Sequence, residues 1–598
     1  MTTPTPAVET RPTLRGTFGM VSATHWLASH AAMAELEAGG NAFDAAVAAG
    51  FVLHVVEPHL NGPGGEAPAI FATADDPTPT VLCGQGPAPS GATPEHYRSL
   101  GLDLIPGSGP VAAAVPGAVD AWLLLLRDHG TRRLAEVLSY AIGYARDGHP
   151  FLPRAADLIT TMADQFTEHW PTSAALWLRD GRAPGHWSRF RNPDYAAMLE
   201  RLVAEGEAAG AVREAQVDGA RQAWREGFVA EAVEAFQRQP HRDASGQDHA
   251  GLVTGADMAA WSATYEPATV RRFRDVEVAK TGPWGQGPVL LQSLALLEDL
   301  EDVLLDPGTT DGVHTIAEVL KLAMADREAW YGDVPDVPLE TLLSAGYAGE
   351  RRTLIGPAAS RELRPGSPDG REPRLSEHVR VARSIDVPAG LGEPTVTVPS
   401  GETRGDTCHV DVVDRWGNIV SATPSGGWLQ SSPTVPGLGF CLGSRMQMFW
   451  LDDGLPSTVA PGRRPRTTLS PTLVLRDGRP VLACGTPGGD QQDQWQLLFL
   501  LRHLVGGLEL QGAIDAPTWH STSFPGSFYP REMAPGGLVV EDRLGEGVIA
   551  ELTRRGHDVT RSGPWSLGRL CAVAIDRDSG LFSAGANPRG GQGYACGR

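Results

Sequence analysis

Cysteine is scarce in this sequence, and its placement offers no metal site. The six cysteines among 598 residues form no Cys-x-x-Cys pair and no close cluster with histidine, so the ligand spacing of a zinc site is missing. Six scattered thiols also give no dense disulfide framework, which favours reduced cysteines. We therefore predict a protein without a metal ion or another cofactor.

Long hydrophobic runs and an excess of positive charge are missing too. No stretch of 18 or more apolar residues occurs, and the first residues lack a basic segment followed by an apolar core. Neither a membrane span nor a signal peptide is predicted, and we expect a cytoplasmic protein. The 50 Lys and Arg against 71 Asp and Glu give a net charge of −21. A surface this acidic repels phosphate backbones, which argues against nucleic-acid binding.

What the sequence does have is length, turns and regular apolar patterns. Its 71 glycines and 48 prolines predict many loops between long apolar-periodic segments. Residues 1–15 are predicted as a flexible tail and residues 115–350 as mostly helical. Residues 350–406, rich in Pro, Gly and Arg, are predicted as a mobile loop. From residue 407 onward, predicted β-hairpins alternate with helices, which indicates sheets covered by helical layers.

Thr407 directly precedes the first strand of the first of these hairpins. The apolar-alternating segment 408–413 is followed by a turn at 415–418 and a second apolar run at 419–422. A threonine hydroxyl is a weak nucleophile, but self-cleavage before Thr407 would free an α-amine that serves as its base. A flexible segment before it would allow that cleavage. An ordinary strand threonine, favoured by its branched Cβ, is the alternative interpretation.

Two loops offer polar groups for a substrate. Residues 485–492 read Gly-Thr-Pro-Gly-Gly-Asp-Gln-Gln and connect a predicted strand to a predicted helix. Glycines there let backbone N–H groups converge on the oxyanion of an acyl-transfer intermediate. The loop lacks the lysine of a phosphate-binding loop, and a tight turn capped by Asp490 is the alternative. The second loop carries Thr467 and Thr468, whose hydroxyls suit either substrate binding or turn capping.

Cys408 and His409 do not form a catalytic pair in our interpretation. Adjacent residues of a strand point to opposite faces, so this thiol and this imidazole cannot meet. His54 and His59 lie on either side of a Glu-Pro pair. We interpret them as packing residues at a helix end rather than as metal ligands.

Taken together, these segments resemble the gamma-glutamyltransferase family of N-terminal-nucleophile hydrolases, along nearly the whole chain. The resemblance implies a four-layer αββα sandwich, made as a precursor. The precursor would cleave itself into a large subunit, 16–406, and a small subunit, 407–598, which stay associated in one compact unit. The matching segments are Gly19–His25, Gly39–Ala48, Val56–His59, Gly62–Gly65, Ala114–Gly117, Lys321–Arg327, Asp406–Thr407, Thr467–Pro471 and Thr486–Gly489.

The resemblance also implies catalytic roles, residue by residue. Thr407 matches the nucleophile, which first attacks the Asp406–Thr407 peptide bond and later the amide of a substrate. Ser425 falls where the family keeps a second hydroxyl that supports the nucleophile. Gly488 and Gly489 match the glycines of the oxyanion hole.

The substrate contacts of the family are where this sequence departs. Thr467–Thr468 replace paired serines that touch the α-carboxylate of the substrate. The arginine that binds this carboxylate is Gln85 here, and an asparagine of the site is Gly427. The Gln and Asp that hold the α-amine correspond to Arg445 and Met448. Loss of a bidentate arginine removes a contact of about 1.5–3 kcal/mol, and methionine cannot pair with an ammonium.

We therefore predict a self-cleaving threonine amidohydrolase that acts on a small amide with a carboxylate in its acyl part and no α-amine. Oxamate amidohydrolases and dicarboxylyl-cephalosporin acylases are relatives of this divergent kind. Hydrolysis of glutathione, or transfer of γ-glutamyl groups, is one alternative. An unprocessed, non-catalytic homologue with a binding role is another. The expected partners are a small-molecule amide and the two subunits of one precursor, and a homodimer stays open.

Overall fold

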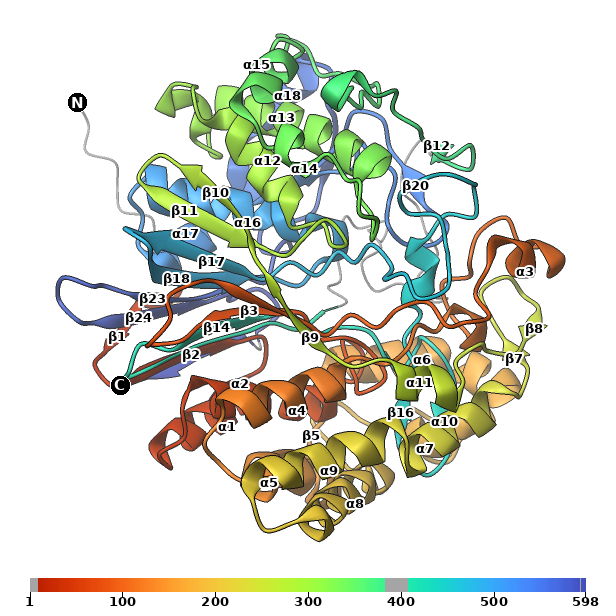
Figure 1. Cartoon of the computed structure of the whole chain (residues 1–598). Coiled ribbons are helices and arrows are strands. Elements are labelled where there is room, and N and C mark those ends of the chain that lie inside the picture. The colour runs from red at the N-terminus through yellow and green to blue at the C-terminus, as the bar shows by residue number, and fades with distance from the viewer. Residues whose placement is uncertain (1–8, 382–406, 592) are drawn as a thin grey trace.

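Two antiparallel sheets of seven strands each form the middle of the structure within the described residues (Figure 1). The computed structural model describes residues 9–381, 407–591 and 593–598. Sheet 1 has the strand order β25 (Tyr594–Gly597), β2 (Gly19–Ala23), β13 (Val410–Asp414), β14 (Ile419–Ala422), β3 (Ala69–Ala72), β4 (Thr80–Cys83) and β9 (Thr264–Pro267). Sheet 2 has the order β1 (Leu14–Gly16), β24 (Phe582–Ala586), β23 (Cys571–Ile575), β18 (Arg479–Gly485), β17 (Thr472–Arg476), β11 (Val276–Lys280) and β10 (Thr269–Phe273).

The alternation of side chains along the strands explains why the two sheets stack and why each also carries helices. On β13, Val413 faces the core between the sheets, whereas Val410 and Val412 face the helices below sheet 1. On β17, Leu473 faces the core between the sheets, and Val474 faces the helices above sheet 2. Each sheet is therefore buried on both faces, as the middle layers of a sandwich must be.

Helices cover the two outer faces of the sheets, which confirms the predicted αββα arrangement (Figure 1). The layer below sheet 1 contains α1 (Trp26–Glu37), α2 (Ala42–Val56), α4 (Ala118–His129), α5 (Leu134–Asp147), α8 (Pro193–Ala209), α9 (Arg213–Arg225) and α10 (Phe228–Gln237). The layer above sheet 2 contains α12 (Pro288–Leu297), α13 (Thr310–Trp330), α15 (Ala345–Arg352), α16 (Gln492–Leu500), α17 (Leu510–Asp515) and α18 (Glu546–Arg554).

Further helices and short strands occur in the described part of the chain. The further helices are α3 (Pro94–Ser99), α6 (Pro153–His169), α7 (Pro171–Trp177), α11 (Gly255–Ala260) and α14 (Leu339–Leu342). The short strands are β5 (His149–Pro150), β6 (Arg189–Phe190), β7 (His241–Arg242), β8 (Asp248–His249), β12 (Arg380–Val381), β15 (Thr434–Val435), β16 (Phe440–Cys441), β19 (Trp519–Ser521), β20 (Glu532–Met533), β21 (Gly537–Val540) and β22 (Asp558–Arg561).

Local signals in the sequence agree with several of these boundaries. Asn41 begins α2 with a capping box, because its side chain accepts from the N–H of Asp44 while the Asp44 side chain accepts from the Asn41 N–H. The hairpin predicted at 408–422 is the pair β13–β14, and the further hairpins after residue 407 include β17–β18 and β23–β24. The helix predicted after the 485–492 loop is α16, which is followed by a π-helical turn, Leu501–Val505.

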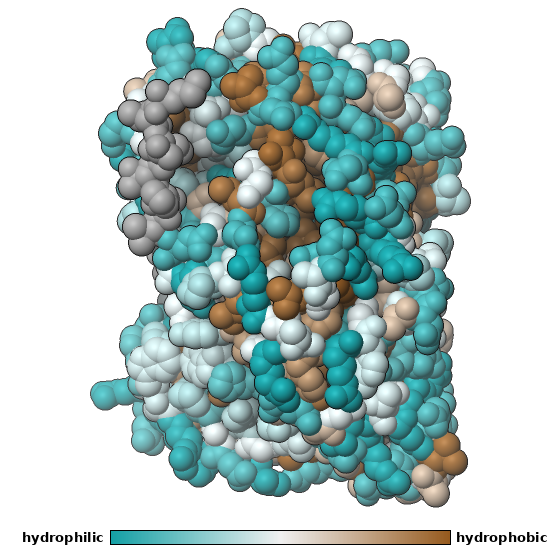
Figure 2. Space-filling view, turned by 90° about the vertical axis from the view of Figure 1, so that its left-hand side faces the viewer, coloured by the Kyte–Doolittle hydropathy of each residue, from teal (hydrophilic) through white to brown (hydrophobic). Residues whose placement is uncertain are grey.

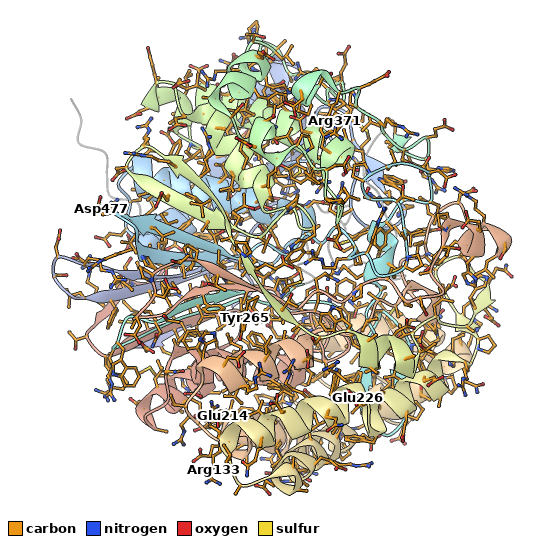
Figure 3. All side chains as sticks on the ribbon, in the orientation of Figure 1. Arg133, Glu214, Glu226, Tyr265, Arg371 and Asp477 are labelled. Carbon is orange, nitrogen blue, oxygen red and sulfur yellow. The ribbon has the colours of Figure 1, made fainter. Side chains whose placement is uncertain are left out.

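The N-terminal residues that the structure describes contact the body of the protein. The Thr10 N–H donates to Asp515 at 2.6 Å, and β1 begins at Leu14, so the described part of the predicted tail is attached to the body. Asp477, in the turn between β17 and β18, points outward, whereas Tyr265 of β9 is half-buried (Figure 3). On the face shown in Figure 2, apolar residues form a band through the middle with polar residues on both sides.

Some predictions lie outside the described residues. These are Asp406, the rest of 382–406 and residues 1–8. The earlier part of the predicted mobile loop is described, and it is attached to α13. Lys321 donates to the Ser360 carbonyl at 2.8 Å, and Arg364 pairs with Glu318 at 3.0 Å. Among the helices described, none combines the length and the apolar character that crossing a membrane requires.

Candidate active site

Thr407 and Ser425 face each other where β13 enters the middle of sheet 1. The two residues form an antiparallel bridge, and the Thr407 Oγ1 hydroxyl donates to Ser425 Oγ at 3.2 Å. Both are fully buried. Ser425 is fixed in turn by Glu66, since the two backbones exchange N–H to carbonyl hydrogen bonds of 2.9 Å in both directions. The predicted nucleophile and its supporting hydroxyl are therefore in contact.

Arg445 reaches the same hydroxyl from the other side. Its Nη2 donates to Ser425 Oγ at 2.9 Å, and its guanidinium forms an ion pair with Glu66. The guanidinium also lies over the rings of Trp428 and Phe528, at 5.3 and 5.8 Å from their centroids. Because Ser425 Oγ accepts from both Thr407 and Arg445, its own hydrogen must point away from both. Glu66 was not predicted, although it directly follows a glycine-rich segment that was.

Met448, in the same 3₁₀ turn as Arg445, also touches the guanidinium. The Nη1 group of Arg445 contacts Met448 Sδ at 3.8 Å, and within the described residues this weak acceptor is its hydrogen-bond partner. Nη1 therefore keeps N–H groups that a stronger acceptor would satisfy. Gly427, where the family has an asparagine, has φ of +65° and packs against the backbone of Gly62 and Gly65. A side chain there would collide with this backbone.

The glycine loop after β18 lies close to the start of β13. A Cβ on Gly485 would stand 2.2 Å from the His409 ring. Gly488 and Gly489 have φ of 129° and 54°, which L side chains rarely adopt. Among the hydrogen bonds of the described residues, neither of their N–H groups has a partner. Both N–H groups therefore have no competing acceptor among the described residues, and their role in an oxyanion hole stays a prediction.

Asp490 does not cap α16, which was the alternative interpretation of this loop. No side chain caps the turn 489–491. The Asp490 carboxylate instead accepts from the Ser527 N–H and hydroxyl, at 2.8 and 2.6 Å, and pairs with Arg327. Phe528, next along the chain, packs on Arg445. This contact connects the glycine loop to the Thr407–Ser425 pair.

The loop that carries Thr467 and Thr468 lies beside the glycine loop, residues 485–492. The Gln286 N–H donates to the Thr467 carbonyl at 2.9 Å, and Gln286 Nε2 donates to the Gly489 carbonyl at 3.3 Å. Thr467 and Thr468 are both buried, and Thr468 Oγ1 has no hydrogen-bond partner among the described residues. The structure thus brings the predicted substrate-binding threonines next to the predicted oxyanion glycines, through a glutamine that sequence reasoning missed.

Gln85 is less directly connected. Its side chain is fully buried and donates to the carbonyl of the next residue, Gly86, at 3.1 Å. The residue before it contacts the residue after Glu66, since the Ala67 N–H donates to the Gly84 carbonyl at 3.2 Å. Gln85 therefore lies near Glu66 in the structure. No hydrogen bond joins it to another predicted site residue in the described part of the chain.

Cys408 and His409 diverge as predicted. The Cys408 thiol donates to Glu57 at 3.0 Å, below sheet 1, and burial raises its pKa well above the ordinary value. His409 points to the other face and bonds to Thr423 and Asp411, each at 2.9 Å. A neutral thiol facing away from Ser425 is a poor nucleophile for this site.

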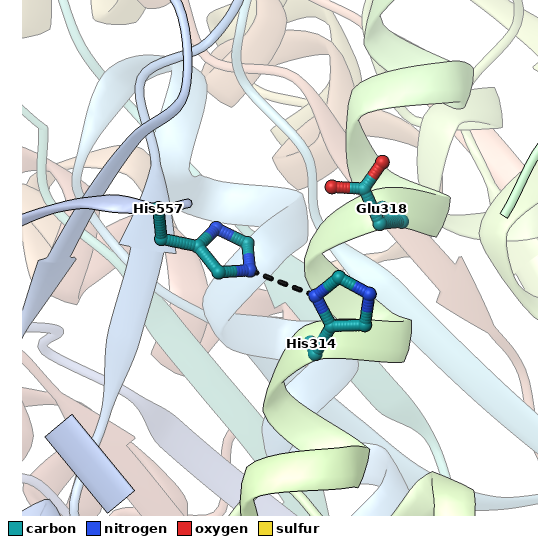
Figure 4. A group of neighbouring side chains, drawn as sticks. All are labelled: His314, Glu318 and His557. Carbon is teal, nitrogen blue, oxygen red and sulfur yellow. Dashed lines mark hydrogen bonds between the residues drawn. The ribbon is translucent and has the colours of Figure 1, made fainter. Parts of the chain in front are cut away.

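A separate cluster contains residue types that bind metal ions (Figure 4). His314 Nδ1 and His557 Nε2 share a hydrogen bond of 3.0 Å, and Glu318 lies one turn along α13 from His314. Glu318 already pairs with Lys321 and with Arg364. Two cations on one carboxylate oppose a third, so we interpret the cluster as a structural network. Burial, together with the charge of Lys321, lowers the pKa of His557 to about 3.

Comparison with known proteins identifies the family. A family model described as gamma-glutamyltranspeptidase matches residues 28–597. The chain belongs to the gamma-glutamyltranspeptidase family. Glutathione hydrolase-like YwrD proenzyme of Bacillus subtilis (strain 168) is 30% identical over 583 residues, which cover 96% of this chain and 98% of that protein. Oxamate amidohydrolase proenzyme of Klebsiella pneumoniae subsp. pneumoniae is 30% identical over 587 residues, with 96% and 97% covered.

Solved structures agree with the assignment to the gamma-glutamyltranspeptidase family. The structure named LmbA2991HD is 59% identical to this chain, with a TM-score of 0.94, and covers 99% of this chain and 100% of its own. Cephalosporin acylase from Bacillus halodurans is 26% identical, with a TM-score of 0.81 and coverage of 100% and 99%. The relatives named as proenzymes indicate a family whose members are made as precursors. The predicted resemblance, including its acylase and oxamate amidohydrolase relatives, is confirmed.

Proposed function

We propose that this gamma-glutamyltranspeptidase-family protein cleaves itself before Thr407 and then hydrolyses a small amide through an ester on the Thr407 hydroxyl. The observation that carries the proposal is the 3.2 Å hydrogen bond from Thr407 to Ser425 at the start of β13. The unpartnered N–H groups of Gly488 and Gly489 in a neighbouring loop support it. The names of the relatives, which include two hydrolases named as proenzymes and an acylase, support it further.

The proposed chemistry needs no group outside this site. The Thr407 hydroxyl first attacks the carbonyl carbon of the Asp406–Thr407 peptide bond, the C–N bond breaks, and water hydrolyses the resulting ester, which frees the Thr407 α-amine and restores the hydroxyl. In the processed enzyme the α-amine accepts the hydroxyl proton, directly or through a water molecule. Oγ1 then forms a bond to the acyl carbon of the substrate, and the N–H groups of Gly488 and Gly489 donate to the oxyanion. Collapse of this intermediate breaks the C–N bond, and the leaving amine takes the proton. Water attacks the resulting ester in the same way and releases the acid.

The proposed substrate carries a carboxylate in its acyl part and no α-amine. Arg445 supports this, because its Nη1 retains N–H groups beside the hydroxyl of Ser425. Glu66 neutralises the net charge of Arg445, so the contact would be a directed hydrogen bond more than a long-range attraction. Met448 offers an ammonium group no counter-charge. The relative named oxamate amidohydrolase acts, by its name, on an acyl group of this kind.

The first test of this proposal is self-processing. We predict that wild-type protein gives two fragments that divide between Asp406 and Thr407, and that Thr407→Ala gives one chain, because the variant lacks the attacking hydroxyl. Intact-mass spectrometry of both proteins measures this outcome. A single full-length chain in both would support the alternative of a non-catalytic homologue and would overturn the proposal.

The second test concerns the substrate. Glutaryl-p-nitroanilide and γ-glutamyl-p-nitroanilide differ only in the α-amine. We predict that processed enzyme has a kcat/KM at least about 10-fold higher for the glutaryl compound, because a buried ammonium without a partner costs more than 1.4 kcal/mol. Release of p-nitroaniline measures both rates, with oxamate as a third substrate followed by ammonia release. Thr407→Ala is the control for hydrolysis independent of the site.

Hydrolysis of γ-glutamyl compounds is the second candidate function. The description of the matching family model and the name of the Bacillus subtilis relative favour it. It would require that the site hold an α-amine through groups other than Met448. A higher kcat/KM for γ-glutamyl-p-nitroanilide than for the glutaryl compound would support this candidate and reject the amine-free substrate.

A further inference from the structure

A buried cluster of charged residues lies directly behind the glycine loop. It contains three arginines and two carboxylates, each 6% exposed or less: Arg327, Arg466, Arg531, Glu328 and Asp490. Arg327 is fully buried near the end of α13 and contacts both carboxylates. Isolated charges are almost never buried this deeply unless they are paired and hydrogen-bonded. The arrangement of this cluster is therefore tied closely to the loops around it.

The Arg327 guanidinium contacts three of the loops that form the candidate site. Its Nη1 pairs with Asp490 of the glycine loop and donates to Gln286 Oε1 at 2.8 Å. Gln286 donates in turn to the carbonyls of Thr467 and Gly489. The Nη2 group of Arg327 donates to the Pro525 carbonyl at 3.0 Å, two residues before Ser527, which binds Asp490.

The glycine loop needs such support because its own chain supplies little. Gly488 and Gly489 lack side chains, and their positive φ angles are values that glycine visits without strain but also leaves freely. The ring of Trp495 packs on Gly488 from one side, where a Cβ would stand 2.2 Å away. From the other side the loop is held through Asp490 and Gln286, and both contacts end on one guanidinium.

The charge balance of the cluster also favours a role in supporting the glycine loop. Three guanidinium groups and two carboxylates leave one excess positive charge behind the loop. Burial alone would raise the pKa of Glu328, but Arg466, Arg327 and Arg531 together lower it to about 2. Glu328 therefore stays ionised, and its ion pairs hold the three arginines in position. An excess positive charge in a water-excluded region stabilises negative charge that develops in front of it.

We propose that Arg327 is the positioning residue of the oxyanion loop: through Asp490 and Gln286 it fixes the direction of the Gly488 and Gly489 N–H groups during amide hydrolysis. The proposal rests on the proposed function, since it assigns those N–H groups to the oxyanion. It predicts an effect on the chemical step and not on substrate binding, because Arg327 lies behind the loop.

The test compares Arg327→Lys with a matched control, Arg351→Lys. Arg351 is also a buried arginine that pairs with an aspartate of α13, at 3.2 Å, but its other hydrogen bonds go to the carbonyls of Leu322 and Arg364, and none goes to the glycine loop among the described residues. Lysine keeps the charge but loses the planar fork, in which Nη1 reaches Asp490 and Gln286 while Nη2 reaches Glu328 and the Pro525 carbonyl. On glutaryl-p-nitroanilide we expect Arg327→Lys to lower kcat about 10- to 100-fold with KM within about 2-fold. Arg351→Lys should keep both values within about 2-fold and show a similar drop in thermal midpoint.

A second variant makes the result independent of the folding of the first. Asp490→Asn preserves the shape of the side chain and weakens its pairing with Arg327, so we expect a fall in kcat of about 10-fold. If Arg327 acts through Asp490, the kcat of the double variant, Arg327→Lys with Asp490→Asn, should be no lower than that of the less active single variant, because both substitutions remove the same support. Multiplication of the two losses would overturn the proposed connection.

The outcomes separate this inference from the proposed function. Absence of hydrolysis by processed wild-type enzyme on all three substrates would reject the proposed function itself. An active wild type in which Arg327→Lys and Arg351→Lys have the same kcat would reject only the role of Arg327. Failure of both Arg327→Lys and Asp490→Asn to process, with normal processing of Arg351→Lys, would place the cluster in maturation and also overturn the inference.

Discussion

At the scale of single residues, the site is defined as much by substitutions as by matches to the family. Thr407, Ser425, Gly488 and Gly489 could be located from the sequence because short motifs with fixed neighbours carry them. The partner of Arg445 could not be located in this way. Glu66 lies 379 positions from Arg445 in the sequence, and no local pattern reports a pair this distant. The short motifs of the sequence therefore indicated the chemistry, whereas the electrostatic balance of the site emerged only from the fold.

The pair of Arg445 and Glu66 leads to a prediction about stability. Both side chains are at least 96% buried, and Arg445→Met would remove the guanidinium from a buried carboxylate. We expect a loss of about 3–5 kcal/mol, whereas Arg445→Met combined with Glu66→Gln should recover most of it, because no ionised group then remains without its partner. Unfolding is measured in a Thr407→Ala background, where the chain stays in one piece. Additive losses in the double variant would show that the pair contributes no such coupling.

At the scale of elements, the predictions succeeded where a pattern is local. The hairpin β13–β14 follows from alternation, and α13, within the predicted helical region 115–350, follows from helical periodicity. The interpretation of Asp490 as a cap failed because a capping position and an anchoring position have the same residue type. Only the approach of α13, which brings Arg327 to the loop, distinguishes the two.

The element scale also explains why the sequence assigns no role to Arg327, although the Lys321–Arg327 segment matches the family. A helix that is buried around its whole circumference, as α13 is, hides which of its polar residues face a site. Its side chains at 326 and 327 point to different neighbours: Asp326 pairs with Arg351, and Arg327 pairs with Asp490.

At the scale of the whole molecule, the order of strands decides how a cleaved chain would hold together. In sheet 1, β2 lies between β25 and β13, so a strand from before residue 407 is enclosed by two from after it. In sheet 2, the strands from after residue 407 lie between β1 and β11. Each sheet is thus built from both sides of the proposed cleavage point, and neither side contains a complete hydrophobic core.

This arrangement predicts that the two fragments remain one particle after processing. Separation would expose the edges of β2, β13 and β14, with their unpaired N–H and carbonyl groups, as well as the apolar residues between the sheets. We expect native mass spectrometry and size-exclusion chromatography to show a species containing one copy of each fragment, or a multiple of it, which separates only in denaturant. Each fragment expressed alone should be insoluble or unfolded. Elution of two independent folded fragments in native buffer would contradict the prediction, because the interleaved sheets leave neither fragment a core of its own.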